Sequence, residues 1–174
     1  MVTDNVFLRT MRRLENADRL DPAVRVADPL AGRLVADRRL RRFFRGDATG
    51  IPPHVVAKDV PFGAWFMAIF LDLFPDPDAG ARRAATRLVA LGVIAATPTG
   101  ISGWAEWARA DRGTRRVGVV HAAANLAATL IFLASWAART RDRHRLGVGL
   151  ARAGGALLIV GGFLGGYMGR ARRP

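Results

Sequence analysis

The sequence predicts an all-α protein, a four-helix transmembrane bundle preceded by amphipathic, arginine-rich N-terminal helices. Of its 174 residues, 51% are hydrophobic, yet 27 are Lys or Arg and only 14 are Asp or Glu. The apolar residues are gathered in four blocks, with the charges before and between them. One block, "LVALGVIAATPTGISGW", has no polar face, whereas a helix on the surface of a soluble protein would show one. This separation of apolar and charged residues favours a membrane bundle over a soluble one.

The residue types present exclude several kinds of site. The chain has no cysteine, so disulfides, thiolate zinc sites and cysteine-ligated iron–sulfur clusters are excluded within it. A metal or haem would need His, carboxylate, Tyr or Met ligands, and the histidines are His54, His121 and His144. Residues 1–20 hold no uninterrupted apolar segment, so we expect no signal peptide there and insertion by the later blocks.

Residues 1–53 are the first predicted unit, a charged helical region that lies on the membrane surface. One apolar face has helical spacing, formed by Phe7, Leu8, Met11 and Leu14. Asp21-Pro22 and Asp28-Pro29 each have the pattern of an N-cap followed by proline in the first turn. The second pair predicts a helix through "LAGRLVADRRLRRFF", whose apolar stripe faces away from its arginines and consists of Leu30, Leu34, Val35 and Phe43.

Residues 54–174 are the second predicted unit, a domain of four transmembrane helices. The spans are expected at about 60–74, 88–107, 117–138 and 146–169, joined by short charged connectors. The first is short for a bilayer, which needs about 20 apolar residues, so upstream residues or tilt must extend it. Pro98 lies within the second span and is expected to kink it, because proline cannot donate a hydrogen bond to the carbonyl one turn earlier.

Arginine placement predicts the orientation of this multi-pass protein in the cell membrane. More cationic residues flank the spans on the side of the termini (Arg41, Arg42, Arg45, Lys58, Arg109, Arg112, Arg115, Arg116, Arg170, Arg172 and Arg173) than on the other side (Arg82, Arg83, Arg87, Arg139, Arg141, Arg143 and Arg145). The positive-inside rule therefore predicts that both termini are cytoplasmic.

The fourth span is rich in glycine, which lets helix backbones approach closely in lipid. Gly161, Gly165 and Gly169 form one row, and Gly162 and Gly166 form a second row beside it. Packing within the bundle is the main interpretation of this face, and homodimerisation through it is the alternative.

Polar residues inside the spans need partners, because an unpaired polar group in hydrocarbon is costly. His121 and Asn125 share one face of the third span, where they are expected either to make an interhelical hydrogen bond or to bind a ligand. Four antiparallel helices also place further polar residues in the same leaflet, namely His54, Asp59, Glu106 and Tyr167. Asp72 belongs to the opposite leaflet and is expected at the interface.

Four segments in order resemble the domain-of-unknown-function 2231 family of bacterial membrane proteins. They are "GIPPHVVAKDVPFGAWFMAIFLDL", "LVALGVIAATPTGISGWAEW", "RRVGVVHAAANLAATLIFLASWAAR" and "GGFLGGYMGR". The resemblance implies a four-helix integral membrane protein. Some relatives also carry a Rieske-type iron–sulfur domain, which links the family to electron transfer by association.

The family pattern differs from this chain at two histidine positions. Matched by position, the family's G-H-P-L-H-P begins at Gly50 and its final G-G-H ends at Tyr167, so Ile51 and Tyr167 stand where relatives have histidine. The family's H-x-x-x-N is His121 and Asn125. If the missing histidines bind haem or metal in relatives, the resemblance implies that this chain has lost or changed that site.

Two functions follow from these observations. The first is a structural or accessory membrane subunit, with a redox complex as one partner to consider. The alternative is a b-type haem or metal-binding electron-transfer protein that uses His54 and His121, with Tyr167 as a further candidate ligand. The absence of hydrolase, kinase and dinucleotide motifs argues against an enzyme. The basic run "RRLRRFFR" indicates contact with anionic lipid headgroups rather than nucleic acid, because it lies beside a membrane span.

Overall fold

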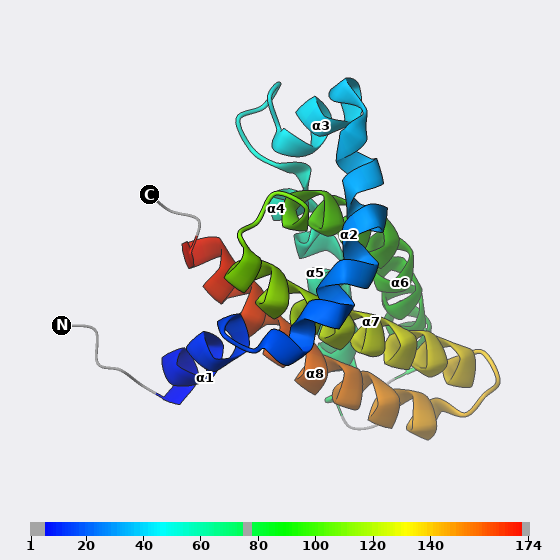
Figure 1. Ribbon diagram of the computed structural model, residues 1–174. Coiled ribbons are helices and arrows are strands. Elements are labelled where there is room, and N and C mark those ends of the chain that lie inside the picture. The colour runs from blue at the N-terminus through cyan, green and yellow to red at the C-terminus, as the bar shows by residue number, and fades with distance from the viewer. Residues whose placement is uncertain (1–5, 75–77, 172–174) are drawn as a thin grey trace.

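The computed structural model describes residues 6–74 and 78–171, and within these ranges the secondary structure is entirely helical (Figure 1). Four segments are long and apolar enough to cross a membrane, and they are Pro53–Leu71, Ala79–Trp107, Arg112–Arg139 and His144–Arg170. The prediction of a four-helix transmembrane bundle after N-terminal helices is therefore confirmed. Arg172 and Arg173, which the predicted orientation also counts, lie outside the described residues.

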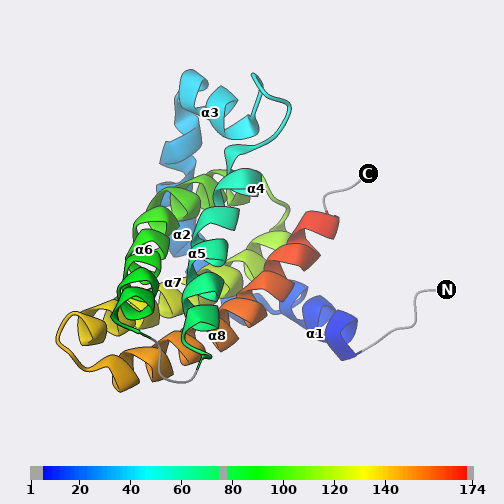
Figure 2. The same ribbon diagram turned by 180° about the vertical axis from the view of Figure 1, so that it is seen from behind.

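All four spans begin before their predicted starts, and the first ends at Leu71 rather than at 74. The first combines the short helix α4 (Pro53–Ala57) with α5 (Asp59–Leu71), so upstream residues do lengthen it. The second, α6 (Ala79–Trp107), starts where the Asp78 side chain accepts a hydrogen bond of 2.7 Å from the Ala81 amide. This N-cap places Arg82, Arg83 and Arg87 inside the helix rather than in a connector. α6 stays helical through Pro98, and its ribbon curves along its second half (Figure 2).

The third and fourth spans form the closest helix pair of the bundle. On α7 (Arg112–Arg139) and α8 (His144–Ala171), the buried or half-buried residues recur every three and four positions. Among them, the series with this spacing comprises Gly118, His121, Asn125, Ala128, Phe132, Ser135 and Arg139 on α7, and Gly147, Ala151, Gly154, Leu158, Gly161, Gly165 and Met168 on α8. This spacing is that of an antiparallel coiled-coil seam, here with small residues that bring the helices close together.

Trp65 lies at the centre of the core, between the helix pair α5–α6 and the helix pair α7–α8. Its ring stacks on Phe132 at a centroid distance of 4.3 Å, and its Nε1 donates to the Val89 carbonyl at 3.2 Å. A Cβ added at Gly92 would lie only 2.3 Å from the same Nε1. The indole is thus held between α5, α6 and α7, and glycine at position 92 makes room for it.

The N-terminal helices lie across the end of the bundle where α6 ends and α7 begins (Figure 1). They are α1 (Val6–Glu15), the 3-10 turn η1 (Asp18–Leu20), α2 (Asp21–Ala36) and α3 (Arg38–Arg45). The predicted apolar face of α1 packs against the bundle, with Met11 buried beside Val117, Leu164 and Met168.

The predicted helix start at Asp28-Pro29 is wrong. α2 begins one pair earlier, at Asp21-Pro22, and runs through Pro29 to Ala36. Asp37 then caps the separate helix α3, its carboxylate accepting hydrogen bonds from the Arg39 and Leu40 amides at 2.8 and 2.9 Å. Because of this break, Leu30 and Phe43 of the predicted stripe are both exposed, and Ala31 is the buried residue of α2.

Candidate functional site

His121 and Asn125 form a polar contact between α7 and α8. The His121 Nδ1 lies 2.9 Å from the Gly161 carbonyl oxygen of α8, and the Asn125 amide donates to the His121 carbonyl at 2.8 Å. The Thr129 hydroxyl continues the chain by donating to the Asn125 carbonyl at 2.8 Å. This side-chain network therefore links α7 to the backbone of α8 inside the apolar region.

The glycines of α8 face three directions: some face α7, one faces α5, and others face a side that no described residue covers. A Cβ at Gly161 or Gly165 would lie 3.1 or 3.0 Å from the side chains of Asn125 and His121, so this row faces α7. A Cβ at Gly162 would lie 3.7 Å from Phe62 of α5. Cβ atoms at Gly166 and Gly169 would meet no described atom within 4 Å, so homodimerisation through that side stays a prediction.

His54 makes a second polar contact, on a different helix pair. Its Nδ1 lies 3.1 Å from the Thr99 carbonyl of α6 and 3.4 Å from the Ser102 hydroxyl. The Thr99 hydroxyl also donates to the Ala57 carbonyl at 3.1 Å. These bonds attach α4 to the part of α6 that follows Pro98.

The remaining residues of the predicted one-leaflet cluster lie in separate surroundings. Asp59 is exposed and pairs with Lys58 at 2.7 Å, whereas Glu106 is buried near the end of α6. Tyr167 packs edge-on against Phe7 of α1, at a ring-centroid distance of 6.2 Å. The structure thus joins His121 to Asn125 and places His54 close enough to His121 for the two imidazoles to interact electrostatically, whereas Tyr167 packs against α1.

Sequence reasoning missed a buried ion pair at the opposite end of the bundle. Asp72, the residue after α5, forms a bidentate pair with Arg139 of α7, and their side chains are 2% and 0% exposed. The Arg139 Nε also donates to the Ser135 hydroxyl at 3.2 Å, and that hydroxyl donates to the Gly147 carbonyl at 2.6 Å. Arg152 of α8 reaches the Asp72 carbonyl at 3.3 Å. This network connects the ends of three spans.

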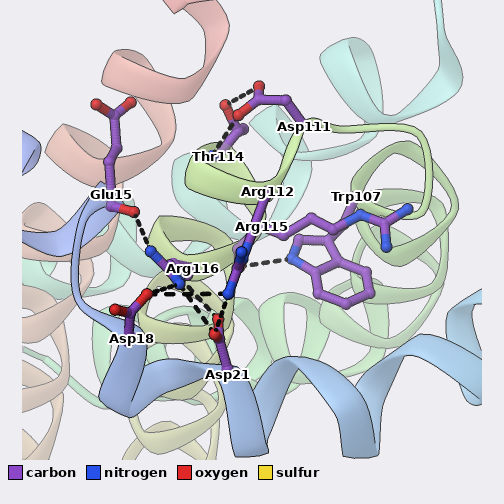
Figure 3. Close-up of polar contacts among 9 residues, drawn as sticks. All are labelled: Glu15, Asp18, Asp21, Trp107, Asp111, Arg112, Thr114, Arg115 and Arg116. Carbon is purple, nitrogen blue, oxygen red and sulfur yellow. Dashed lines mark hydrogen bonds and ion pairs between the residues drawn. The ribbon is translucent and has the colours of Figure 1, made fainter.

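A second missed network attaches the N-terminal helices to the start of α7. The Arg116 guanidinium donates hydrogen bonds to the carboxylates of Asp18 and Asp21 and to the Glu15 carbonyl, as Figure 3 shows. Its side chain is only 6% exposed. Arg112 adds a bond of 2.6 Å to Asp21. Hydrogen bonds from Arg116 and Arg112 hold the pKa of the Asp21 carboxyl well below its ordinary value.

Arg115 extends this attachment toward the α6–α7 connector. It donates to Asp28 of α2 at 2.8 Å and to the Ala108 and Ala110 carbonyls at 2.6 and 2.9 Å. Its guanidinium also lies 5.2 Å from the ring centroid of Trp107. We call residues 6–45, held by Arg112, Arg115 and Arg116, the N-terminal cap.

A protein-family model described as "Predicted membrane protein (DUF2231)" matches residues 50–172. The chain belongs to this family. The match covers the four spans of the DUF2231 domain and leaves the N-terminal cap outside it. The comparisons with curated proteins and with solved structures found no match.

His54 and His121 each place the Nδ1 atom within hydrogen-bond distance of a backbone carbonyl, a contact that fixes the orientation of the ring. The two histidines bind backbone carbonyls on different helix pairs, and the seam beside His121 is closed by Gly161 and Gly165. Two surface cavities, of about 580 and 610 Å³, are lined by other residues than His54 and His121. Within residues 6–74 and 78–171, no group of three or more His, Asp or Glu residues is arranged to hold a metal ion.

Proposed function

We propose that this DUF2231 protein is a non-enzymatic structural or accessory subunit of the cell membrane. The observation that supports it most is the use of His54, His121 and Asn125 in bonds between helices of the same chain. Polar groups used in this way stabilise a bundle rather than present a reactive site. A redox complex remains the class of partner that the family resemblance suggests.

The N-terminal cap supports a role at the membrane surface. α3 carries five arginines, Arg38, Arg39, Arg41, Arg42 and Arg45, around the exposed apolar side chains of Leu40 and Phe43. Short helices of this kind place apolar side chains in the headgroup region and attract anionic lipids through their cations. We propose that α3 holds the cap against anionic headgroups of the leaflet in which the spans α5 and α7 begin.

The test of the accessory role is a reduced-minus-oxidised optical spectrum of protein expressed with sufficient haem and purified in detergent. The expected spectrum is flat in the wild type. In His121→Ala, loss of the bond to Gly161 is expected to lower stability by about 0.6 kcal/mol, as for other hydrogen bonds between membrane helices. Thermal unfolding in detergent measures this change, with Leu126→Ala, at an exposed position of the same helix, as the control.

A Soret shift with sharp α and β bands would contradict the accessory role and favour the haem alternative. If the bands then disappear in His121→Ala and in His54→Ala, both histidines are ligands. If they disappear in neither variant, the haem has other ligands and Tyr167→Phe is the next variant.

We also propose that both termini are cytoplasmic, on the excess of cationic residues beside that end of the spans. The absence of cysteine makes single-cysteine labelling straightforward. In intact cells, a membrane-impermeant maleimide is expected to label Arg143→Cys, in the α7–α8 connector, and not Arg19→Cys, in the cap. The reverse pattern would show that the orientation is inverted.

A further inference from the structure

A basic cavity of about 580 Å³ lies at the end of the bundle opposite the N-terminal cap. Its wall comes from the first turns of α6, the end of α7 and the start of α8. The cationic side chains Arg82, Arg83, Arg87 and Arg139 line it, together with His144 and one carboxylate, Asp142.

Part of this positive charge has no counterion within the described chain. Arg139 is neutralised by Asp72, but Arg83 and Arg87 make no hydrogen bond or ion pair with any described residue. The Nε2 atom of His144 is buried and has no hydrogen-bond partner in the described ranges. The cavity therefore combines uncompensated guanidinium groups with an unused imidazole nitrogen.

The helix ends around the cavity strengthen its attraction for anions. α6 and α8 both begin here, and neither has an acidic residue in its first turn. The positive end of a helix dipole disfavours nearby cations and favours nearby anions. The Asp78 carboxylate already offsets this effect at the first amides of α6, and a further anion among the arginines would add to it.

The depth of the cavity matches the level of lipid headgroups. Arg87 immediately precedes the apolar block that begins at Leu88. One and two turns further along the same helix face, Leu91 and Ile94 are 47% and 70% exposed. An acyl chain lying along these side chains would bring its phosphate to the arginines. On this geometry, we propose that the cavity binds a phosphate-bearing anion, which an anionic phospholipid headgroup would supply from the membrane.

Lipid binding to the full-length protein tests this inference, with native mass spectrometry as the readout. The probes are phosphatidylglycerol, phosphatidylcholine and inorganic phosphate. The wild type is expected to prefer phosphatidylglycerol, and Arg83→Gln/Arg87→Gln is expected to lose about five-fold in affinity per arginine removed. The charge-preserving variant Arg83→Lys/Arg87→Lys is expected to keep most of the affinity.

The matched control is Arg141→Gln/Arg143→Gln, which removes the same charge from the same end of the bundle but does not line the cavity. Its affinity is expected to stay within about two-fold of the wild type. Equal losses in the two glutamine variants, or no preference for phosphatidylglycerol in the wild type, would overturn the inference. Inorganic phosphate that competes at millimolar concentration would identify a free anion as the ligand, and no competition would identify the lipid headgroup.

Folding of the variants is checked by thermal unfolding in phosphatidylcholine nanodiscs. Arg83 and Arg87 are exposed, so both double variants are expected to unfold within about 2 °C of the wild type. The inference depends only on the membrane location of the bundle, and it holds whether or not the protein acts as an accessory subunit.

Discussion

Asp72→Ala is expected to destabilise the bundle by about 3–5 kcal/mol, because it leaves Arg139 as a buried charge without its partner. The Arg139 side chain is fully buried, and its guanidinium is held in place by Asp72 and Ser135. Unfolding in mixed micelles of mild detergent and dodecyl sulfate measures the change.

Two comparisons distinguish the buried pair from a general charge effect. Asp59→Ala removes an exposed carboxylate from the same helix and is expected to cost less than about 0.5 kcal/mol. The double variant Asp72→Leu/Arg139→Met replaces the pair by apolar groups and is expected to recover most of the loss. Equal effects of Asp72→Ala and Asp59→Ala would show that the pair contributes nothing special to stability.

Arg116→Gln is expected to release the N-terminal cap from the bundle without unfolding the spans. Arg116 is the only described side chain that contacts Asp18, Asp21 and the Glu15 carbonyl at the same time. Hydrogen exchange should therefore accelerate by about ten-fold or more at the α1 and α2 amides and stay unchanged in α7 and α8. Arg25→Gln, on the exposed face of α2, is the matched control and is expected to leave exchange unaltered.

The same attachment has a defined pH dependence. The pKa of Asp21 is lowered in the folded protein. The contribution of this carboxylate to the attachment of the N-terminal cap is therefore fully present above the unfolded pKa of Asp21, about 4. The contribution is lost as the pH falls through the lowered folded value. We expect the cap to stay attached at neutral pH and to detach only in strong acid. Asp21→Asn should weaken the attachment at neutral pH and remove most of this acid sensitivity. Release of the wild-type cap between pH 6 and 7 would contradict this assignment.

The apolar blocks made the four spans predictable, since a block of about 20 apolar residues has few alternatives to a membrane helix. The helix ends were harder to place. Asp78 is the N-cap residue of α6, so this helix starts well before its apolar block. The arginines inside its first turns resemble connector residues in the sequence. At Asp28-Pro29 a plausible start signal was overridden, because α2 was already helical from Asp21 and Asp28 is used instead to bind Arg115.

The candidate site was only partly predictable. His121 and Asn125 share a face by helical spacing alone, so their contact follows from the sequence. Their partner, the Gly161 carbonyl, has no signature in residue identity. Asp72 and Arg139 lie 67 positions apart and each resembles an ordinary interfacial charge. The signal that would have paired them is the topology itself, since the end of the first span and the end of the third meet in one leaflet.

The N-terminal cap also sets an order of events during synthesis. Arg112 and Arg116 bind carboxylates that lie 91 to 98 positions earlier in the chain. At about 5–20 residues per second, a ribosome needs several seconds to make that intervening length. During this interval, on our proposed orientation, the acidic residues of the N-terminal cap are in the cytoplasm without their arginine partners. The cap can attach to the bundle only after the start of the third span has been synthesised. Nascent chains stalled before Arg112 should consequently have an N-terminal segment that is not attached to the bundle. Chaperones and the membrane surface can contact this segment before the bundle does.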